Sequence, residues 1–200
     1  MMKNTGLPKI KLIGETDKVV ELSTGYATSM SAVQRWDNKL VIVDFNSDLG
    51  LFLTESGDLI CTIDLGEFPN EIEGAMSPVI AEDTLYYILA LSGVVRAVEL
   101  DSDTVCENRP NTVISPLGQV PNDLHVFGDS IWVIHSADNN LIHYDRMTGS
   151  ERERLILSPG TNPWHAAFSP DGRWIAVTEW ASSTLTIFDQ VSGEERKIGM

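Results

Sequence analysis

A short turn recurs along this 200-residue chain. It reads Ser56-Gly57-Asp58, Thr148-Gly149-Ser150 and Ser192-Gly193-Glu194, each between one β-rich run and the next, and Asp101-Ser102-Asp103 takes the remaining place. The central residues of these turns are 45, 47 and 44 positions apart. A period of this length, with about four short strands in each unit, is typical of a β-propeller blade. The sequence therefore predicts an all-β fold in which like sheets pack against one another around an axis.

The last repeat shows the four strands of a unit most clearly, counted from the propeller axis outward. They are predicted at residues 164–168, 174–178, 184–188 and 195–198. The turn Ser169-Pro170-Asp171-Gly172 separates the first two, because proline presets φ and Asp-Gly favours a tight turn. The third strand alternates polar and apolar residues with the period of 2 that a sheet requires.

We expect a single propeller domain over residues 1–200. Its blades are predicted at 28–66, 72–108, 121–158 and 163–199, and the second blade has a short outer strand near Thr104. Residues 9–23 are predicted to form an outer hairpin, as in a blade that is closed by both chain ends. No matching inner pair precedes Met200. This pattern favours about four and a half blades of a larger ring, of the seven-bladed type, truncated or completed by another chain. The alternative is a four-bladed ring with the hairpin packed outside.

The charge balance argues against nucleic acid as a partner. The chain has 14 basic and 29 acidic side chains, a net charge of −15, and its basic residues alternate with acidic ones, as at 151–154. Such a surface repels phosphate backbones. No run approaches about 18 apolar residues, so no membrane span is expected. The first residues lack the apolar core of a signal peptide. We expect a cytoplasmic protein as written, or a periplasmic or extracellular one if a leader was removed.

The two cysteines are predicted to be free thiols. Cys61 and Cys106 occupy equivalent places in neighbouring repeats. Equivalent positions on adjacent blades are expected to lie farther apart than the roughly 7 Å between Cα atoms that a disulfide tolerates. No zinc-binding spacing is present.

The last two repeats contain motifs that resemble a known family. Pro121-Asn122-Asp123 and Asn162-Pro163-Trp164 each precede a strand, and Ser169-Pro170-Asp171-Gly172-Arg173 follows the second of them. Over residues 120–198 the chain resembles the YVTN-type, YncE-like propeller repeat family, although several propeller families share the last of these motifs. The resemblance implies a seven-bladed ring, similar in shape to quinoprotein amine dehydrogenase and haem d1 domains. Most members of the family have no established reaction, and many are exported.

Three segments that lead into inner strands begin alike. They are Pro69-Asn70-Glu71, Pro121-Asn122-Asp123 and Asn162-Pro163-Trp164-His165. Inner strands and the loops before them line the central channel of a propeller, where loops on a rigid frame carry function. The candidate ligand-binding residues are Asn70, Glu71, Asn122, Asp123, His125, Trp164 and His165. The alternative is that proline and asparagine only shape the turn into the strand.

The histidines and tryptophans can serve either as ligand groups or as packing groups. His125 and His165 can approach the axis from adjacent blades, whereas His135 and His143 are predicted to be ordinary sheet residues. We expect no metal site, because three or four ligands must converge on one point. The tryptophans predicted to fill space between blades are Trp132, Trp164, Trp174 and Trp180. The alternative for Trp164 and Trp180 is an aromatic rim around a ligand.

The sequence favours a non-enzymatic scaffold that binds a small molecule or a protein partner through the loops before its inner strands. No catalytic residue and no cofactor is predicted, since no nucleophile elbow or phosphate loop is present. One alternative is a metal-assisted, lactonase-like hydrolase that uses Glu73, Asn122 and Asp123. Another is an incomplete propeller with no activity of its own, which would self-associate through its open edge.

Overall fold

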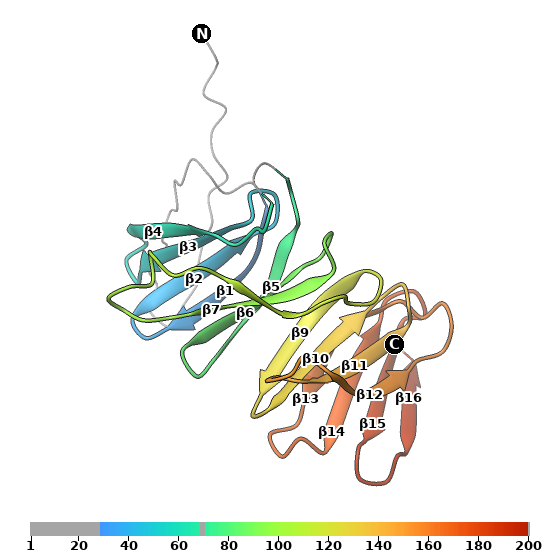
Figure 1. Ribbon diagram of the computed structural model, residues 1–200. Coiled ribbons are helices and arrows are strands. Elements are labelled where there is room, and N and C mark those ends of the chain that lie inside the picture. Colours follow the sequence, from blue (N-terminus) through green and yellow to red (C-terminus); the bar gives the residue numbers. More distant parts are fainter. Residues whose placement is uncertain (1–28, 69–70, 200) are drawn as a thin grey trace.

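The computed structural model describes residues 29–68 and 71–199. These residues form four sheets of four antiparallel strands each, with no helix among them, and in each sheet the strands are neighbours in chain order (Figure 1). The predicted all-β propeller fold is confirmed. The hairpin predicted at residues 9–23 and the candidate ligand residue Asn70 lie outside the described residues.

Each of the four blades is one sheet. The first contains β1 (Met30–Trp36), β2 (Lys39–Asp44), β3 (Leu49–Thr54) and β4 (Leu59–Asp64). The second contains β5 (Ala75–Ala81), β6 (Thr84–Leu89), β7 (Val94–Glu99) and β8 (Asn111–Ile114). The third contains β9 (Pro121–Phe127), β10 (Ser130–His135), β11 (Asn140–Asp145) and β12 (Glu151–Ile156). The fourth contains β13 (Pro163–Phe168), β14 (Trp174–Glu179), β15 (Thr184–Asp189) and β16 (Glu195–Gly199).

Strand β10 shows how the blades share their cores. All six of its residues are buried. Ile131 and Val133 pack in a cluster with side chains of the second blade, whereas Trp132 and Ile134 pack in a cluster with side chains of the fourth. Side chains alternate between the two faces of a strand, so a strand covered on both faces must be apolar throughout. The continuous apolar runs of this chain therefore mark strands that lie between neighbouring blades.

Polar side chains join each inner strand to the next. Gln34 Nε2 in β1 donates to the carbonyl of Pro78 (2.9 Å), and Ser77 Oγ in β5 donates to the carbonyl of Asn122 (2.8 Å). Asn122 Nδ2 in β9 donates in turn to the carbonyl of Trp164 in β13 (3.2 Å). These hydrogen bonds satisfy backbone groups at the junctions between blades. They fix the relative positions of the inner strands β1, β5, β9 and β13. The candidate site lies on two of these strands, β9 and β13.

The predicted outer strand of the second blade is wrong. Residues 102–107 form turns, and the fourth strand is β8, Asn111–Ile114, rather than a strand near Thr104. The additional residues before β8 form a loop, and this loop carries Cys106. The repeat alignment had placed Cys106 on a strand equivalent to that of Cys61.

The prediction of two free thiols is wrong for the same reason. Cys61 in β4 and Cys106 in the loop before β8 form a disulfide, with 5.9 Å between their Cα atoms. Cys106 is not confined to the sheet of the second blade, so it reaches the outer strand of the first. The disulfide joins two neighbouring blades at their outer edge, far along each sheet from the inner strands.

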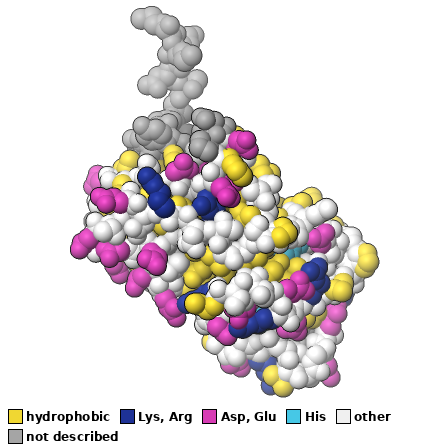
Figure 2. Space-filling model, in the orientation of Figure 1, with side chains coloured by type: hydrophobic (Ala, Val, Ile, Leu, Met, Phe, Trp, Pro, Cys, Tyr) yellow, Lys and Arg dark blue, Asp and Glu magenta, His cyan; other side chains and the backbone are white. Residues whose placement is uncertain are grey.

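Acidic side chains dominate the surface. Figure 2 shows Asp and Glu side chains along the rim of one face, with Lys and Arg side chains interspersed among them. Five arginines of the described residues form ion pairs with carboxylates: Arg35 with Glu55, Arg146 with Glu82, Arg152 with Asp129, Arg154 with Glu151, and Arg173 with Asp189. Within residues 29–68 and 71–199, no helix is long and apolar enough to cross a membrane.

Candidate functional site

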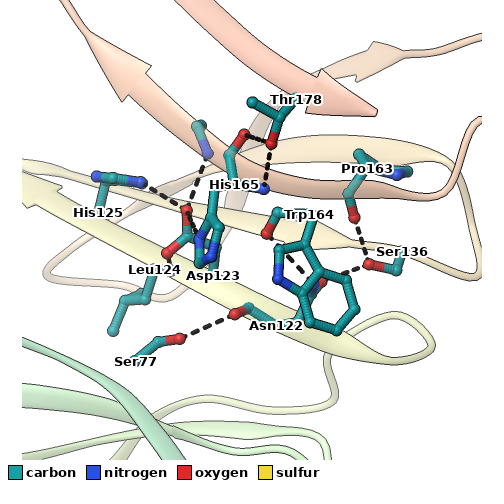
Figure 3. A network of polar contacts seen from close by, with 11 residues as sticks. Ser77, Asn122, Asp123, Leu124, His125, Ser136, Pro163, Trp164, His165 and Thr178 are labelled. Atoms are coloured by element: carbon teal, nitrogen blue, oxygen red, sulfur yellow. Dashed lines mark hydrogen bonds and ion pairs between the residues drawn. The ribbon is translucent and has the colours of Figure 1, made fainter. Parts of the chain in front are cut away.

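The candidate site lies where β9 of the third blade meets β13 of the fourth (Figure 3). Both strands have an irregular register close to their first residue, between Pro121 and Asp123 in β9 and between Pro163 and His165 in β13. A β-bulge adds one residue and redirects the side chains beside it. Asn122 and Trp164 are the added residues.

Asn122 joins the two blades. Its Nδ2 donates to the carbonyl of Trp164, and its Oδ1 accepts a hydrogen bond from the hydroxyl of Ser136 (2.6 Å). The Ser136 hydroxyl also contacts the carbonyl of Pro163. Asn122 is buried, and both ends of its amide have partners within the chain. For this residue the structure agrees with the alternative that asparagine serves nearby backbone groups, and its side chain is not open to a ligand.

Asp123 lies at the centre of the site. Its Oδ2 is 2.9 Å from Nε2 of His125 and 3.4 Å from Nδ1 of His165, and it accepts a hydrogen bond from the backbone N–H of Ala166 (2.9 Å). Its Oδ1 accepts from the N–H of Leu124 (3.1 Å). Asp123 is 9% exposed. Figure 3 shows the two imidazoles converging on this carboxylate, one from each blade.

Two opposing effects set the pKa of Asp123. Burial alone would raise it, because the charged form loses water. The hydrogen bond and the charge of His125, the N–H of Ala166 and the charge of His165 lower it, and together they hold the pKa of Asp123 below its ordinary value. The carboxylate therefore stays ionised in neutral solution, hydrogen-bonded to His125 and 3.4 Å from Nδ1 of His165.

The two histidines differ in exposure. His125 is half-buried, and its ring lies against Phe168 with 5.0 Å between ring centroids. His165 is exposed, and its backbone N–H donates to Thr178 Oγ1 at 3.2 Å. Because Nδ1 of His165 faces Asp123, its Nε2 is the ring nitrogen left for an external partner. A carboxylate behind an imidazole fixes both its orientation and the nitrogen that carries the proton.

Two exposed tryptophans stand beside His165. Trp164 is 46% exposed and Trp180 is 73% exposed, and their ring centroids are 6.4 Å apart. The rings are inclined at 50°, so they do not stack and each keeps a free face. The edge of Trp164 also meets the ring of His165, with 6.3 Å between centroids.

The prediction that the tryptophans fill space between blades is confirmed only for Trp132, which is buried between the third and fourth blades. Trp164, Trp174 and Trp180 belong to the fourth blade, which packs against the third and has no other neighbouring blade among the described residues, so their exposure does not test the prediction. Trp164 is the added residue of a bulge, and Trp180 begins the turn after β14. Neither position follows the alternation of a regular strand. The alternative of an aromatic rim around a ligand stays a prediction for these two residues.

The remaining predicted residue, Glu71, lies elsewhere. It lines a cavity of about 320 Å³ between the first blade and the segment that leads from it to the second, together with Asp48, Asp64 and Phe68. No residue of the Asp123 cluster lines this cavity. The sequence analysis missed Ser136 and Thr178. Each lies where the apolar run of a second strand gives way to polar residues, Ser136 after His135 and Thr178 before Glu179.

The carboxylates named for a metal-assisted reaction do not converge. Glu73 Oε1 accepts from the N–H groups of Glu67 and Phe68, and Oε2 accepts from the hydroxyl of Ser92, at the junction of the first two blades. Asp123 lies on β9 of the third blade, where it contacts His125 and His165. The described part of the chain contains no group of three or more His, Cys, Asp or Glu side chains that could hold a metal ion. The residues therefore do not fit the metal site that this alternative requires.

Comparison with solved structures shows the fold. A streptogramin B lyase aligns over 90% of this chain and 57% of its own, with 12% identity and a TM-score of 0.70. A periplasmic gluconolactonase of Pseudomonas aeruginosa aligns over 84% of this chain and 53% of its own, with 22% identity and a TM-score of 0.62. The computationally designed Ika4 protein aligns over 94% of this chain and 99% of its own, with 9% identity and a TM-score of 0.57.

No protein-family model and no curated protein matches the chain. The chain spans a little more than half the length of the streptogramin B lyase and of the gluconolactonase. At these identities the likeness concerns the arrangement of the strands. Within this common fold, the contacts of Asp123 and the tryptophans beside it are features of this chain.

Proposed function

We propose that this chain is part of a YVTN-type β-propeller scaffold that binds a small molecule or an exposed group of a protein partner at the junction of its third and fourth blades. His165, Trp164 and Trp180 contact the ligand, and Asp123 and His125 position the site. One observation carries the proposal: an exposed imidazole is held by a buried carboxylate of the adjacent blade, beside two uncovered tryptophan rings.

The site is organised before any ligand arrives. Asp123 belongs to β9, and the backbone of His165 is fixed by Thr178 of β14, so two regular sheets set the position of the imidazole. Groups held on strands lose little conformational freedom on binding, and this raises affinity for a given set of contacts. Asp123 positions the imidazole of His165 and does not contact the ligand itself, because both of its oxygens already have partners within the chain.

The tryptophans supply the contact area. A tryptophan offers a large apolar surface and a ring face that attracts cations and stacks on flat groups, at a low cost in side-chain entropy. Such residues are over-represented at binding sites. An exposed pair next to a fixed hydrogen-bonding group therefore supports recognition of a ligand that has both an apolar or charged body and a polar atom.

The proposal can be tested with a metabolite library and a thermal-shift assay. We expect some compounds to raise the Tm of the wild-type chain, and we expect this effect to disappear in His165→Ala and Trp164→Ala. Trp174→Ala is the matched control, because Trp174 is similarly exposed but belongs to the opposite end of β14. The same compounds should stabilise this control as they stabilise the wild type.

Two results would contradict the proposed scaffold function. One is that every stabilising compound acts equally on His165→Ala and Trp164→Ala. The other is turnover of a lactone that depends on an added divalent ion and is lost in Asp123→Ala, because this would establish the hydrolase alternative.

A further inference from the structure

We infer that the ligand of the site at Trp164 and Trp180 is an organic cation, with an ammonium or similar group that lies against the two indole rings. The inference rests on the proposed function and adds the chemical class of the ligand to it. It follows from a comparison of the tryptophans of this chain and from the buried charges behind two of them.

The other tryptophans have a charged or basic group on the ring face. Lys39 Nζ lies 4.7 Å from the ring centroid of Trp36, and the guanidinium of Arg173 lies 4.8 Å from that of Trp174. The third case is Trp132, on which an imidazole is stacked with 4.4 Å between centroids. Cation–π attraction favours the pairs at Trp36 and Trp174, whereas burial lowers the pKa of His143 and favours its neutral form on Trp132.

Trp164 and Trp180 differ from this pattern. Within residues 29–68 and 71–199, no Lys or Arg lies over either ring, and their ring partners are each other and the edge contact with His165. Trp164 is 46% exposed and Trp180 is 73% exposed. Two indole faces therefore remain free for a cation from outside the chain.

A buried carboxylate lies directly beside the pair. Glu179 is 1% exposed, immediately precedes Trp180, and pairs across the sheet with Pro163, which precedes Trp164. Its oxygens accept hydrogen bonds from the hydroxyls of Thr186 (2.8 Å) and Ser182 (3.0 Å). It has no ion pair with any Lys or Arg of the described residues. Its charge is therefore not cancelled locally and favours a cation at the surface above it.

Asp123 is a second carboxylate, on β9 of the adjacent blade, and its ion-pair partners are histidines. Two basic side chains of the fourth blade have carboxylate partners of their own, since Arg173 pairs with Asp189 and Lys197 with Glu195. The whole chain carries a net charge of −15, which attracts cations and repels anions. Ring faces, local carboxylates and net charge thus all favour the same class of ligand.

The test compares two molecules of nearly the same shape, choline and the uncharged 3,3-dimethylbutan-1-ol. Indole N–H signals in NMR spectra of the full chain would report binding at individual tryptophans. We expect choline to bind at least about tenfold more tightly than the neutral isostere. Trp180→Ala should weaken choline binding about tenfold, and Trp174→Ala should leave it unchanged.

Any outcome other than these would overturn the inference. Equal or tighter binding of the neutral isostere, with dependence on Trp180, would show that the site exists but that its ligand is not a cation. Choline binding that Trp180→Ala does not affect, or no choline binding at millimolar concentration, would remove the cation assignment. The proposed function has separate tests: it fails if the library screen finds no compound whose effect depends on His165 and Trp164, or if metal-dependent lactone turnover is found and is lost in Asp123→Ala.

Discussion

The disulfide between Cys61 and Cys106 should make a large contribution to stability. It closes a loop across 45 residues and joins the outer strand of the first blade to the second blade. A cross-link restricts the unfolded chain, and for a loop of this length the chain-entropy relation gives about 4 kcal/mol at 25 °C. This is a large share of the roughly 5–15 kcal/mol that stabilises a typical domain.

Urea unfolding measures this contribution. We expect the double variant Cys61→Ala/Cys106→Ala to unfold at a lower urea concentration than the oxidised wild type, with a free energy of unfolding lower by about 4 kcal/mol. Treatment of the wild type with dithiothreitol should shift its midpoint in the same direction. The double variant is the control for the reductant, since it has no disulfide to lose and its midpoint should not move.

Two observations would refute this reasoning. Thiol titration of the denatured, unreduced wild type should find no free thiol, and two free thiols would show that the loop before β8 does not reach β4. Equal urea midpoints for the oxidised wild type and the double variant would show that the cross-link does not restrict the unfolded chain as argued.

Three further predictions concern the packing of the blades. Tyr87→Phe removes the buried hydrogen bond from the hydroxyl to the carbonyl of Leu65 (2.7 Å), and should lower the free energy of unfolding by about 1 kcal/mol in urea titrations. Gly149→Ala should cost more stability than Gly193→Ala: both glycines have positive φ, but only a Cβ at Gly149 would meet a backbone carbonyl of the second blade, at 2.5 Å. Equal costs would contradict that close approach. Burial lowers the pKa of His135, so the unfolded state takes up the proton first as pH falls below about 6.5, and the stability of the wild type should fall from pH 7 to pH 5. The fall should be smaller in His135→Gln, and an unchanged pH profile in this variant would show that His135 contributes nothing to it.

The sequence predicted the architecture because the same physical pattern occurs four times. A turn every 44 to 47 residues and apolar runs such as 131–134 require sheets that are covered on both faces, and the structure has them. The loop of residues 100–110 breaks the pattern. Its length differs from the other repeats, so an alignment by period placed Cys106 on a strand and separated it from Cys61. A local insertion was enough to hide a contact between blades.

Only part of the candidate site could be predicted from the sequence. Asp123, His125 and His165 were identified because polar residues at the start of inner strands face the same channel, and the structure brings them together. The exposure of Trp164 depends on a one-residue bulge, which no residue type in the sequence marks. The role of Asn122 depends on Ser136, a residue of the same blade that periodicity alone does not associate with a site.

A crystal structure of the chain with a bound compound from the library screen tests the central claim most directly. The account predicts ligand density against the rings of Trp164 and Trp180 and within hydrogen-bond distance of His165 Nε2, with Asp123 still engaged behind the imidazole. Density in the cavity lined by Asp48 and Asp64, with the tryptophans uncovered, would contradict it.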